Sequence, residues 1–126
     1  MTAGASVLVV DDDPVIRSML TASLQASGHR VTTADSGSRA LDLVRAEGFD
    51  VVLLDVLMPQ IDGYTVCERL RADRRGAAIP VILLTANFIT ADQEVARQAG
   101  ADDFVVKPFD PYELMARVKA LMPGRP

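Results

Sequence analysis

Five side chains that could bind a metal ion or a phosphate group each end or follow a short run of apolar residues. They are Asp11, Asp12, Asp55, Thr85 and Lys107. Runs of this length and composition are typical of strands buried on both faces of a parallel sheet. Because parallel strands end at the same edge of a sheet, we expect these side chains to lie together there.

This combination of side chains suits phosphoryl chemistry. Three crowded carboxylates repel each other unless a cation is present. Mg²⁺ is the expected cation, because it takes oxygen ligands, keeps bound waters and leaves room for phosphate oxygens. Thr85 would add a hydroxyl and Lys107 a mobile positive charge. A carboxylate can form an acyl phosphate, and Asp55 is the candidate nucleophile because it ends a central strand.

Apolar runs and amphipathic stretches alternate five times, and these elements must position the five side chains. Capping residues, prolines and glycines mark where the helices begin and end. The expected strands are 7–10, 30–34, 51–55, 81–85 and 104–106, and the expected helices are about 14–27, 36–47, 62–76, 90–99 and 111–121. The helix 90–99 has a thin apolar stripe, formed by Val95, Ala96 and Ala99. We expect it to be the least firmly packed helix.

The alternation predicts an α/β fold with a doubly wound parallel sheet of five strands and five helices. The strand order 2-1-3-4-5 fits best, because it leaves the more polar strand 30–34 at an edge. That order also places the switch point of the sheet between the first and third strands, beside Asp11, Asp12 and Asp55.

The composition limits the classes of partner. The chain has 126 residues and a net charge of -4, which fits one domain and argues against direct contact with nucleic acid or an anionic membrane. Its single cysteine allows no internal disulfide and suits the cytoplasm. No targeting segment and no membrane span are expected. We expect one domain over residues 1–122, with 123–126 as a tail or the start of a linker.

Several ordered motifs together resemble one known family. They are Val9-Val10-Asp11-Asp12, Leu54-Asp55 with Met58-Pro59 and Asp62-Gly63, Leu84-Thr85-Ala86, and Gly100-Ala101-Asp102-Asp103-Phe104 leading into Lys107-Pro108-Phe109. This set is similar to the receiver domain of two-component response regulators of the chemotaxis-regulator type. The resemblance extends from about Val7 to Leu121 and implies a flavodoxin-like fold.

The resemblance implies a role for each residue of the site. Asp55 would be the phosphoacceptor, which receives phosphate from a histidine kinase or a phosphotransfer protein. Asp12 and Asp55 would bind Mg²⁺ directly, Asp11 would act mainly through a bound water, and the backbone carbonyl of Leu57 would be a further ligand. The chain would then be no enzyme beyond Mg²⁺-dependent self-phosphorylation and autodephosphorylation.

The resemblance also implies a conformational switch. Thr85 would move to the phosphate on activation, and Lys107 would pair with the phosphate. Phe104 matches the aromatic switch position and would swing inward, which alters the face formed by the elements 90–99, 104–106 and 111–121. That face would control a partner protein or an attached output domain. The Lys107–Pro108 peptide bond is expected to be cis.

Two further expectations follow from the resemblance. Leu57 and Asn87 occupy the positions that tune phosphate lifetime in the family, and an apolar Leu57 predicts that hydrolysis is not among the fastest. Asp103 and Arg117 match receivers joined to winged-helix DNA-binding domains, where such residues pair across a symmetric dimer. A phosphorylation-dependent homodimer through the same face is therefore a hypothesis.

Two alternative functions remain at this point. A phosphatase of the haloacid dehalogenase type would also use an aspartyl phosphate, but it needs a second Asp two residues after the nucleophile, where this chain has Leu57. A degenerate receiver that serves only for docking would lack some of the key groups, and all are present here. The glycine-rich loops of nucleotide-binding enzymes are absent from the sequence.

Three other features are interpreted as structural. His29 has no metal-ligand neighbour at suitable spacing and is expected in a surface loop. Cys67 is expected to be a buried packing residue. Arg71, Arg74 and Arg75 are interpreted as a solvated cluster at a helix end.

Overall fold

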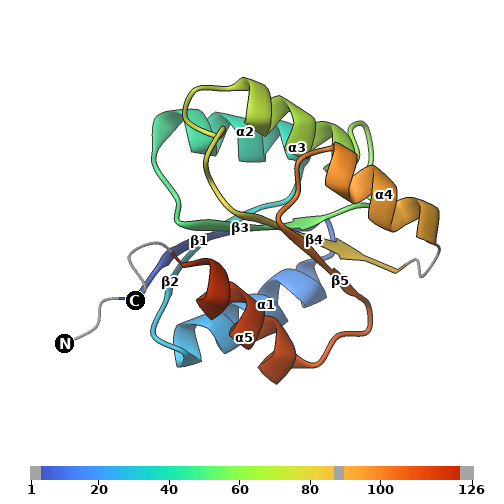
Figure 1. The fold of residues 1–126 in the computed structure, drawn as a ribbon. Coiled ribbons are helices and arrows are strands. Elements are labelled where there is room, and N and C mark those ends of the chain that lie inside the picture. Colours follow the sequence, from blue (N-terminus) through green and yellow to red (C-terminus); the bar gives the residue numbers. More distant parts are fainter. Residues whose placement is uncertain (1–3, 87–89, 123–126) are drawn as a thin grey trace.

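The structure is a computed structural model that describes residues 4–86 and 90–122, without the side chains of residues 90–92. Strands and helices alternate along the whole described chain (Figure 1). The strands are β1 (Ser6–Val10), β2 (Arg30–Ala34), β3 (Val51–Asp55), β4 (Val81–Thr85) and β5 (Asp103–Val106). The helices are α1 (Pro14–Ala26), α2 (Gly37–Ala46), α3 (Gly63–Ala72), α4 (Thr90–Gln98) and α5 (Pro111–Leu121).

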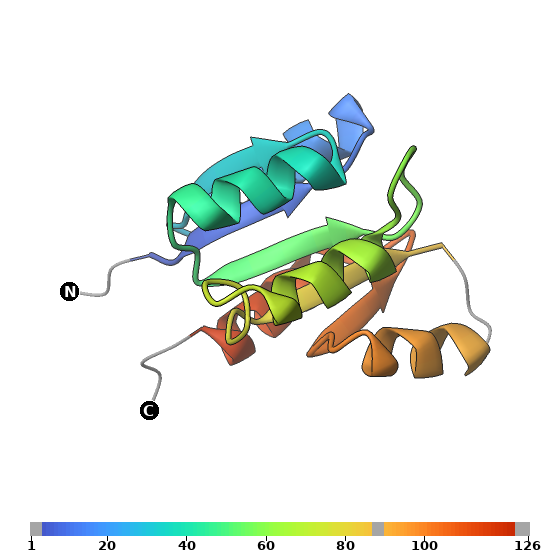
Figure 2. The same cartoon turned by 90° about the horizontal axis from the view of Figure 1, so that it is seen from above.

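The five strands form one parallel sheet in the order β2-β1-β3-β4-β5. This is the predicted order, and the polar strand β2 lies at an edge as expected. Helices α2, α3 and α4 cover one face of the sheet, and α1 and α5 cover the other (Figure 1). All strands point in the same direction, so their C-terminal ends share one edge (Figure 2).

Alternate residues of the central strands feed two separate hydrophobic clusters. Val52 and Leu54 of β3 pack with the helices α2, α3 and α4, whereas Val51 and Leu53 pack with α1 and α5. All four side chains have no exposed surface. Burial on both faces explains why this strand is a continuous run of branched apolar residues.

Aspartates cap three of the helices at the edge where the strands end. The side chains of Asp13, Asp62 and Asp110 accept hydrogen bonds from the backbone N–H groups of the first turns of α1, α3 and α5. Helix α1 ends before Gly28, whose φ of 90° is in the left-handed region that favours glycine. These caps fix where each helix starts relative to the preceding strand.

Two expectations about the helices were wrong in detail. Helix α3 ends at Ala72 and not near Gly76, because residues 73–79 form turns. Val95 was expected to pack inward from α4, but it is 40% exposed, and Ala96 and Ala99 are buried instead. No helix in the described ranges is long and apolar enough to cross a membrane. Asn87 and the tail 123–126 lie outside the described residues.

Candidate functional site

The register of the sheet brings the predicted residues to one edge. Asp55 pairs with Leu84 in the sheet, and Thr85 pairs with Val106. Asp11 follows the last residue of β1, and its backbone N–H donates to the carbonyl of Ala34 at 3.1 Å. The functional groups therefore come from four neighbouring strands that end together.

Asp11, Asp12 and Asp55 form a cluster whose nearest carboxylate oxygens lie within 4.8 Å of one another. Asp11 is fully buried, Asp55 is 5% exposed and Asp12 is exposed. Three hard oxygen ligands with one side open to solvent fit a divalent cation such as Mg²⁺, which keeps several of its waters. The side chains predicted to bind the metal ion are thus close enough to share one.

Lys107 reaches from the end of β5 into this cluster. Its Nζ donates to Asp55 Oδ1 at 2.9 Å and to Asp11 Oδ2 at 3.2 Å. We expected Lys107 to pair with the phosphate. In the structure, the ammonium group also pairs with the two buried carboxylates Asp11 and Asp55. One ammonium group offsets part of the negative charge of the three carboxylates, and the rest remains available to a metal ion.

Burial and charge act in opposite directions on these groups. Burial raises the pKa of Asp55 above its ordinary value, and the hydrogen bond from Lys107 offsets only part of that effect. Burial lowers the pKa of Lys107, but the neighbouring Asp55 and Asp11 outweigh it, so the pKa of Lys107 is raised overall. The lysine is therefore held in its charged form.

The loop between β3 and α3 closes over Asp55. A Cβ on Gly63 would lie 2.3 Å from the backbone oxygen of Asp55, so only glycine fits there. Gln60 has a φ of 73°, a left-handed conformation that is strained for a residue with a Cβ. Leu57 lies in this loop with its side chain 72% exposed, two residues after Asp55.

Thr85 and Lys107 are linked through the backbone. The N–H of Lys107 donates to the carbonyl of Thr85 at 2.7 Å, and the Thr85 residue is 5% exposed. The Lys107–Pro108 peptide bond is cis. Thr85 at the end of β4 is therefore hydrogen-bonded to the residue that follows β5, the strand that carries Phe104.

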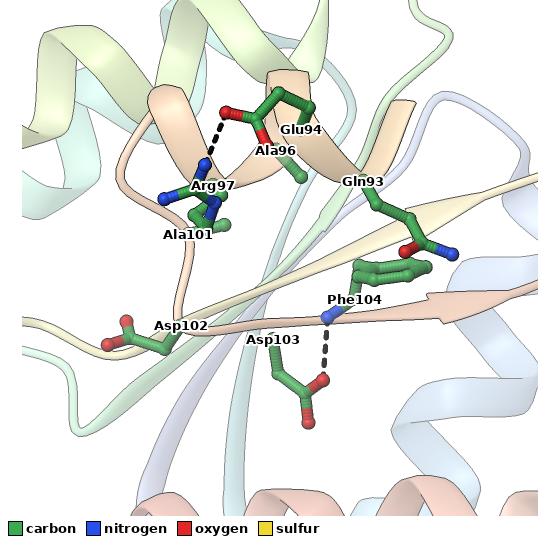
Figure 3. Close-up of a pocket in the computed structure, with 8 residues that line it drawn as sticks. All are labelled: Gln93, Glu94, Ala96, Arg97, Ala101, Asp102, Asp103 and Phe104. Atoms are coloured by element: carbon green, nitrogen blue, oxygen red, sulfur yellow. Dashed lines mark hydrogen bonds and ion pairs between the residues drawn. The ribbon is translucent and has the colours of Figure 1, made fainter. Parts of the chain in front are cut away.

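Phe104 lines a cavity of about 350 Å³ between α4 and β5. Figure 3 shows its ring next to Gln93 of α4, which lines the same cavity. The ring is partly buried and packs against the cluster on the α2, α3 and α4 side of the sheet. Phe104, the predicted switch residue, thus lies beside a cavity between α4 and β5.

The pair predicted to bridge two subunits is formed within one chain. Arg117 Nη1 donates to Asp103 Oδ1 at 2.7 Å, and Arg117 Nη2 donates to Glu113 Oε1 at 3.1 Å. The hydrogen bond that Arg117 donates to Asp103 is the main cause of the raised pKa of Arg117. A dimer that uses Arg117 would have to exchange these partners.

Two residues interpreted as surface features have defined structural contacts. Arg71 donates hydrogen bonds to three backbone carbonyls and to Asp102, so it is not a solvated cluster residue. His29 Nδ1 accepts a hydrogen bond from the backbone N–H of Ala5 at 3.0 Å, and partial burial lowers the pKa of His29. The partners of Arg71 lie up to 31 residues away in the sequence, so no local pattern could have identified them.

Comparisons with known proteins identify the family of the chain. A family model described as the response regulator receiver domain matches residues 7–119. The chain is 41% identical over 116 residues to the DNA-binding dual master transcriptional regulator RpaA of Synechocystis, which covers 92% of this chain and 48% of RpaA. It is 46% identical over 114 residues to the DNA-binding response regulator MtrA of Mycolicibacterium smegmatis, covering 90% of this chain and 49% of MtrA. The chain spans about half the length of the curated relatives it matches.

Solved structures show the same architecture. Chemotaxis protein CheY4 of Vibrio cholerae matches with a TM-score of 0.90 and 32% identity, over 95% of this chain and 100% of that chain. The receiver domain of a sensor histidine kinase from Pseudomonas aeruginosa, solved with a magnesium ion in its active-site cleft, matches with a TM-score of 0.87 and 35% identity, over 94% and 98%. The relatives named as DNA-binding do not support the expectation that nucleic acid contact is absent. They support a signalling module and not a conventional enzyme. The chain belongs to the response regulator receiver domain family of two-component systems.

Proposed function

We propose that Asp55 accepts a phosphoryl group from a histidine kinase or a phosphotransfer protein. The observation that carries the proposal is the position of the Asp55 carboxylate, which lies at the open edge of the sheet within one cluster of carboxylates and within 2.9 Å of a lysine. A carboxylate oxygen of Asp55 forms a bond to phosphorus. The bond between phosphorus and the donor's imidazole nitrogen breaks, and that nitrogen keeps the electron pair.

Residues of this chain hold the charges that develop. The Lys107 ammonium group donates a hydrogen bond to the Asp55 carboxylate. After phosphorylation it can donate a hydrogen bond to a phosphoryl oxygen instead. Thr85 ends the neighbouring strand β4, from which its hydroxyl would approach the phosphoryl group. Water attack on the acyl phosphate then releases inorganic phosphate and regenerates the carboxylate, which is the autodephosphorylation step.

Asp12 and Asp55 would bind Mg²⁺ directly, Asp11 mainly through a water, and the backbone carbonyl of Leu57 would complete the protein ligands. The close approach of three carboxylate oxygens supports this ligand set. When bound, Mg²⁺ supplies positive charge that offsets the repulsion between these carboxylates and the incoming phosphoryl oxygens.

The output would be a change in the face formed by α4, β5 and α5. Movement of Thr85 toward the phosphate opens space inside the sheet edge, and the Phe104 ring moves inward from its cavity. The altered face would control an attached output domain or a separate partner. The transcriptional regulators among the relatives support an attached domain that contacts DNA. A cytoplasmic setting fits a kinase partner of this family.

Phosphorylation would also favour a homodimer through the same face. The charged residues Asp103, Glu113 and Arg117 are grouped on it and pair within one chain. Exchange of these pairs between two copies would keep every charge satisfied. Light scattering with and without a phosphoryl analogue tests this part, and monomers in both states would contradict it.

Intact mass spectrometry after incubation with Mg²⁺ and acetyl phosphate tests the phosphoacceptor. We expect one added phosphoryl group on the wild type, none on Asp55→Asn, and none when Mg²⁺ is chelated. Asp50→Asn is the matched control, because Asp50 is also an aspartate next to β3 but lies at the opposite end of that strand. A phosphoryl group retained in Asp55→Asn would assign the reaction to another residue.

A further inference from the structure

The Arg71 side chain joins two connections that are distant in the sequence. Its guanidinium donates to the carbonyls of Gly76 at 3.0 Å and Ile79 at 2.6 Å, between α3 and β4. It also donates to the carbonyl of Gly100 at 2.8 Å, between α4 and β5, and to Asp102 Oδ2 at 2.7 Å. One side chain thus holds both connections at the N-terminal ends of β4 and β5, opposite the acidic cluster.

Asp102 connects Arg71 to the sheet. Its carboxylate accepts a hydrogen bond from the Val81 N–H at 2.8 Å, and its own N–H donates to the Val81 carbonyl at 2.9 Å. Regular pairing of β5 with β4 then begins with Asp103 opposite Ile82. Arg71 therefore orients the carboxylate that fixes where β5 starts.

Gly100 gives Arg71 access to the end of α4. Its φ of 94° requires glycine, and a Cβ there would lie 2.8 Å from Arg71 Cγ. The Gly100 N–H donates to the carbonyl of Arg97 in the last turn of α4. The arginine stem therefore packs directly beneath the C-terminal end of this helix.

Little else holds α4 among its described side chains. Ala96 is buried within the helix and Ala99 directly after it, whereas Val95 is 40% exposed. Two alanines bury little apolar area, so they contribute little stability. The polar anchor at Gly100 and Asp102 is thus a large part of what places the end of α4.

We propose that Arg71 is a positioning residue that ties the C-terminal end of α4 and the start of β5 to α3. A fixed point at this end directs a change at Thr85 into the Phe104 side chain and the α4–β5 face. Without it, the α4–β5 segment would absorb the change by shifting as a whole. The signalling part of this inference rests on the proposed phosphorylation of Asp55, whereas the anchoring part does not.

The first test uses Arg71→Lys, which keeps the charge and the aliphatic stem but cannot reach four acceptors at once. Arg69→Lys is the matched control, because Arg69 lies on the same helix and is exposed. Amide hydrogen exchange without ligand is measured for both. We expect exchange at Ala101 and Asp102 to rise at least about tenfold in Arg71→Lys, since a hydrogen bond to a charged group is lost.

The location of the effect decides the anchoring part. The amides of β1 should keep their wild-type exchange, and Arg69→Lys should match the wild type throughout. An equal rise in all strands would show a general loss of stability and would overturn the anchor. Asp102→Asn provides a second variant, which keeps an acceptor for the Val81 N–H but removes the ion pair, and it should raise exchange at the same amides.

The second test measures how far a change at the phosphorylation site reaches Phe104 and the α4–β5 face. It uses beryllium fluoride, a phosphoryl analogue, in the presence of Mg²⁺. In Arg71→Lys we expect the affinity to stay within about twofold of wild type, because Asp55 is distant. The NMR shift changes at Phe104 and Val95 should fall to about half or less. Full wild-type shift changes in Arg71→Lys would overturn the positioning role. A wild type that binds no beryllium fluoride would instead contradict the proposed phosphorylation, and the exchange test would still decide the anchor.

Discussion

Lys107 Nζ lies 2.9 Å from Asp55 Oδ1. The proposed phosphoacceptor at the end of β3 therefore forms an ion pair with a lysine that follows β5. The same ammonium group lies 3.2 Å from Asp11 Oδ2. It therefore competes for the carboxylates that a metal ion would use. The site carries enough negative charge for both cations only because Asp12 adds a third, exposed carboxylate.

Removal of this cation should strengthen metal binding. In Lys107→Ala the cluster loses one positive charge a few ångströms from the metal position. We expect the affinity for Mg²⁺ to rise about tenfold at low ionic strength. Isothermal titration calorimetry measures this, with Lys119→Ala as a control that removes the same charge from α5. Equal or weaker binding by Lys107→Ala would show that Lys107 does not oppose the metal ion.

Leu57, two residues after the end of β3, should influence phosphate lifetime. Leu57 is 72% exposed in the loop that follows Asp55, so a polar side chain there can reach a water near the acyl phosphate. We expect Leu57→Asn to hydrolyse several-fold faster, within the range of one positioned hydrogen bond to a reacting water. A dephosphorylation time course after removal of the donor measures the rate. An unchanged rate would show that this position does not orient the water here.

The strands, their order and the gathering of the acidic residues could be predicted from the sequence. Val51–Asp55 is a continuous branched run because both of its faces are buried, and burial of this kind is visible in composition. Asp11 and Asp55 meet because strands in a parallel sheet end together. These are consequences of periodicity and topology, which a sequence displays directly.

The long polar side chains could not be placed in the same way. Arg71 and Asp102 are 31 residues apart, and the two side chains meet only after α3, β4 and α4 have taken their places. Lys107 carries no local signal that its ammonium group pairs with carboxylates on two other strands. Val95 was predicted to be buried because it is apolar, but it is exposed. An apolar residue on a short helix can point to solvent.

The loop between β3 and α3 contains a residue, Gln60, whose replacement should raise the stability of the protein. Gln60 has a φ of 73°, so its backbone is strained, and its side chain is exposed to solvent. We expect Gln60→Gly to raise the free energy of unfolding by about 0.5–1 kcal/mol, since relief of strain exceeds the entropy that glycine adds to the unfolded chain. Urea denaturation measures this. Gln60→Ala keeps the Cβ and should not stabilise; equal gains in both variants would refute the backbone explanation.

The buried thiol of Cys67 should make stability depend on pH at the alkaline end. Burial raises the pKa of the Cys67 thiol to about 11, whereas an unfolded chain has a thiol pKa of about 8.5. Above pH 8.5 the unfolded state therefore loses this proton first, so the free energy of unfolding falls as the pH rises to about 11. Urea denaturation between pH 8 and 11 should show a steeper fall for the wild type than for Cys67→Ala, which lacks the group but keeps every lysine and tyrosine. Parallel curves for the two proteins would mean that the thiol is as acidic in the folded state as in the unfolded one.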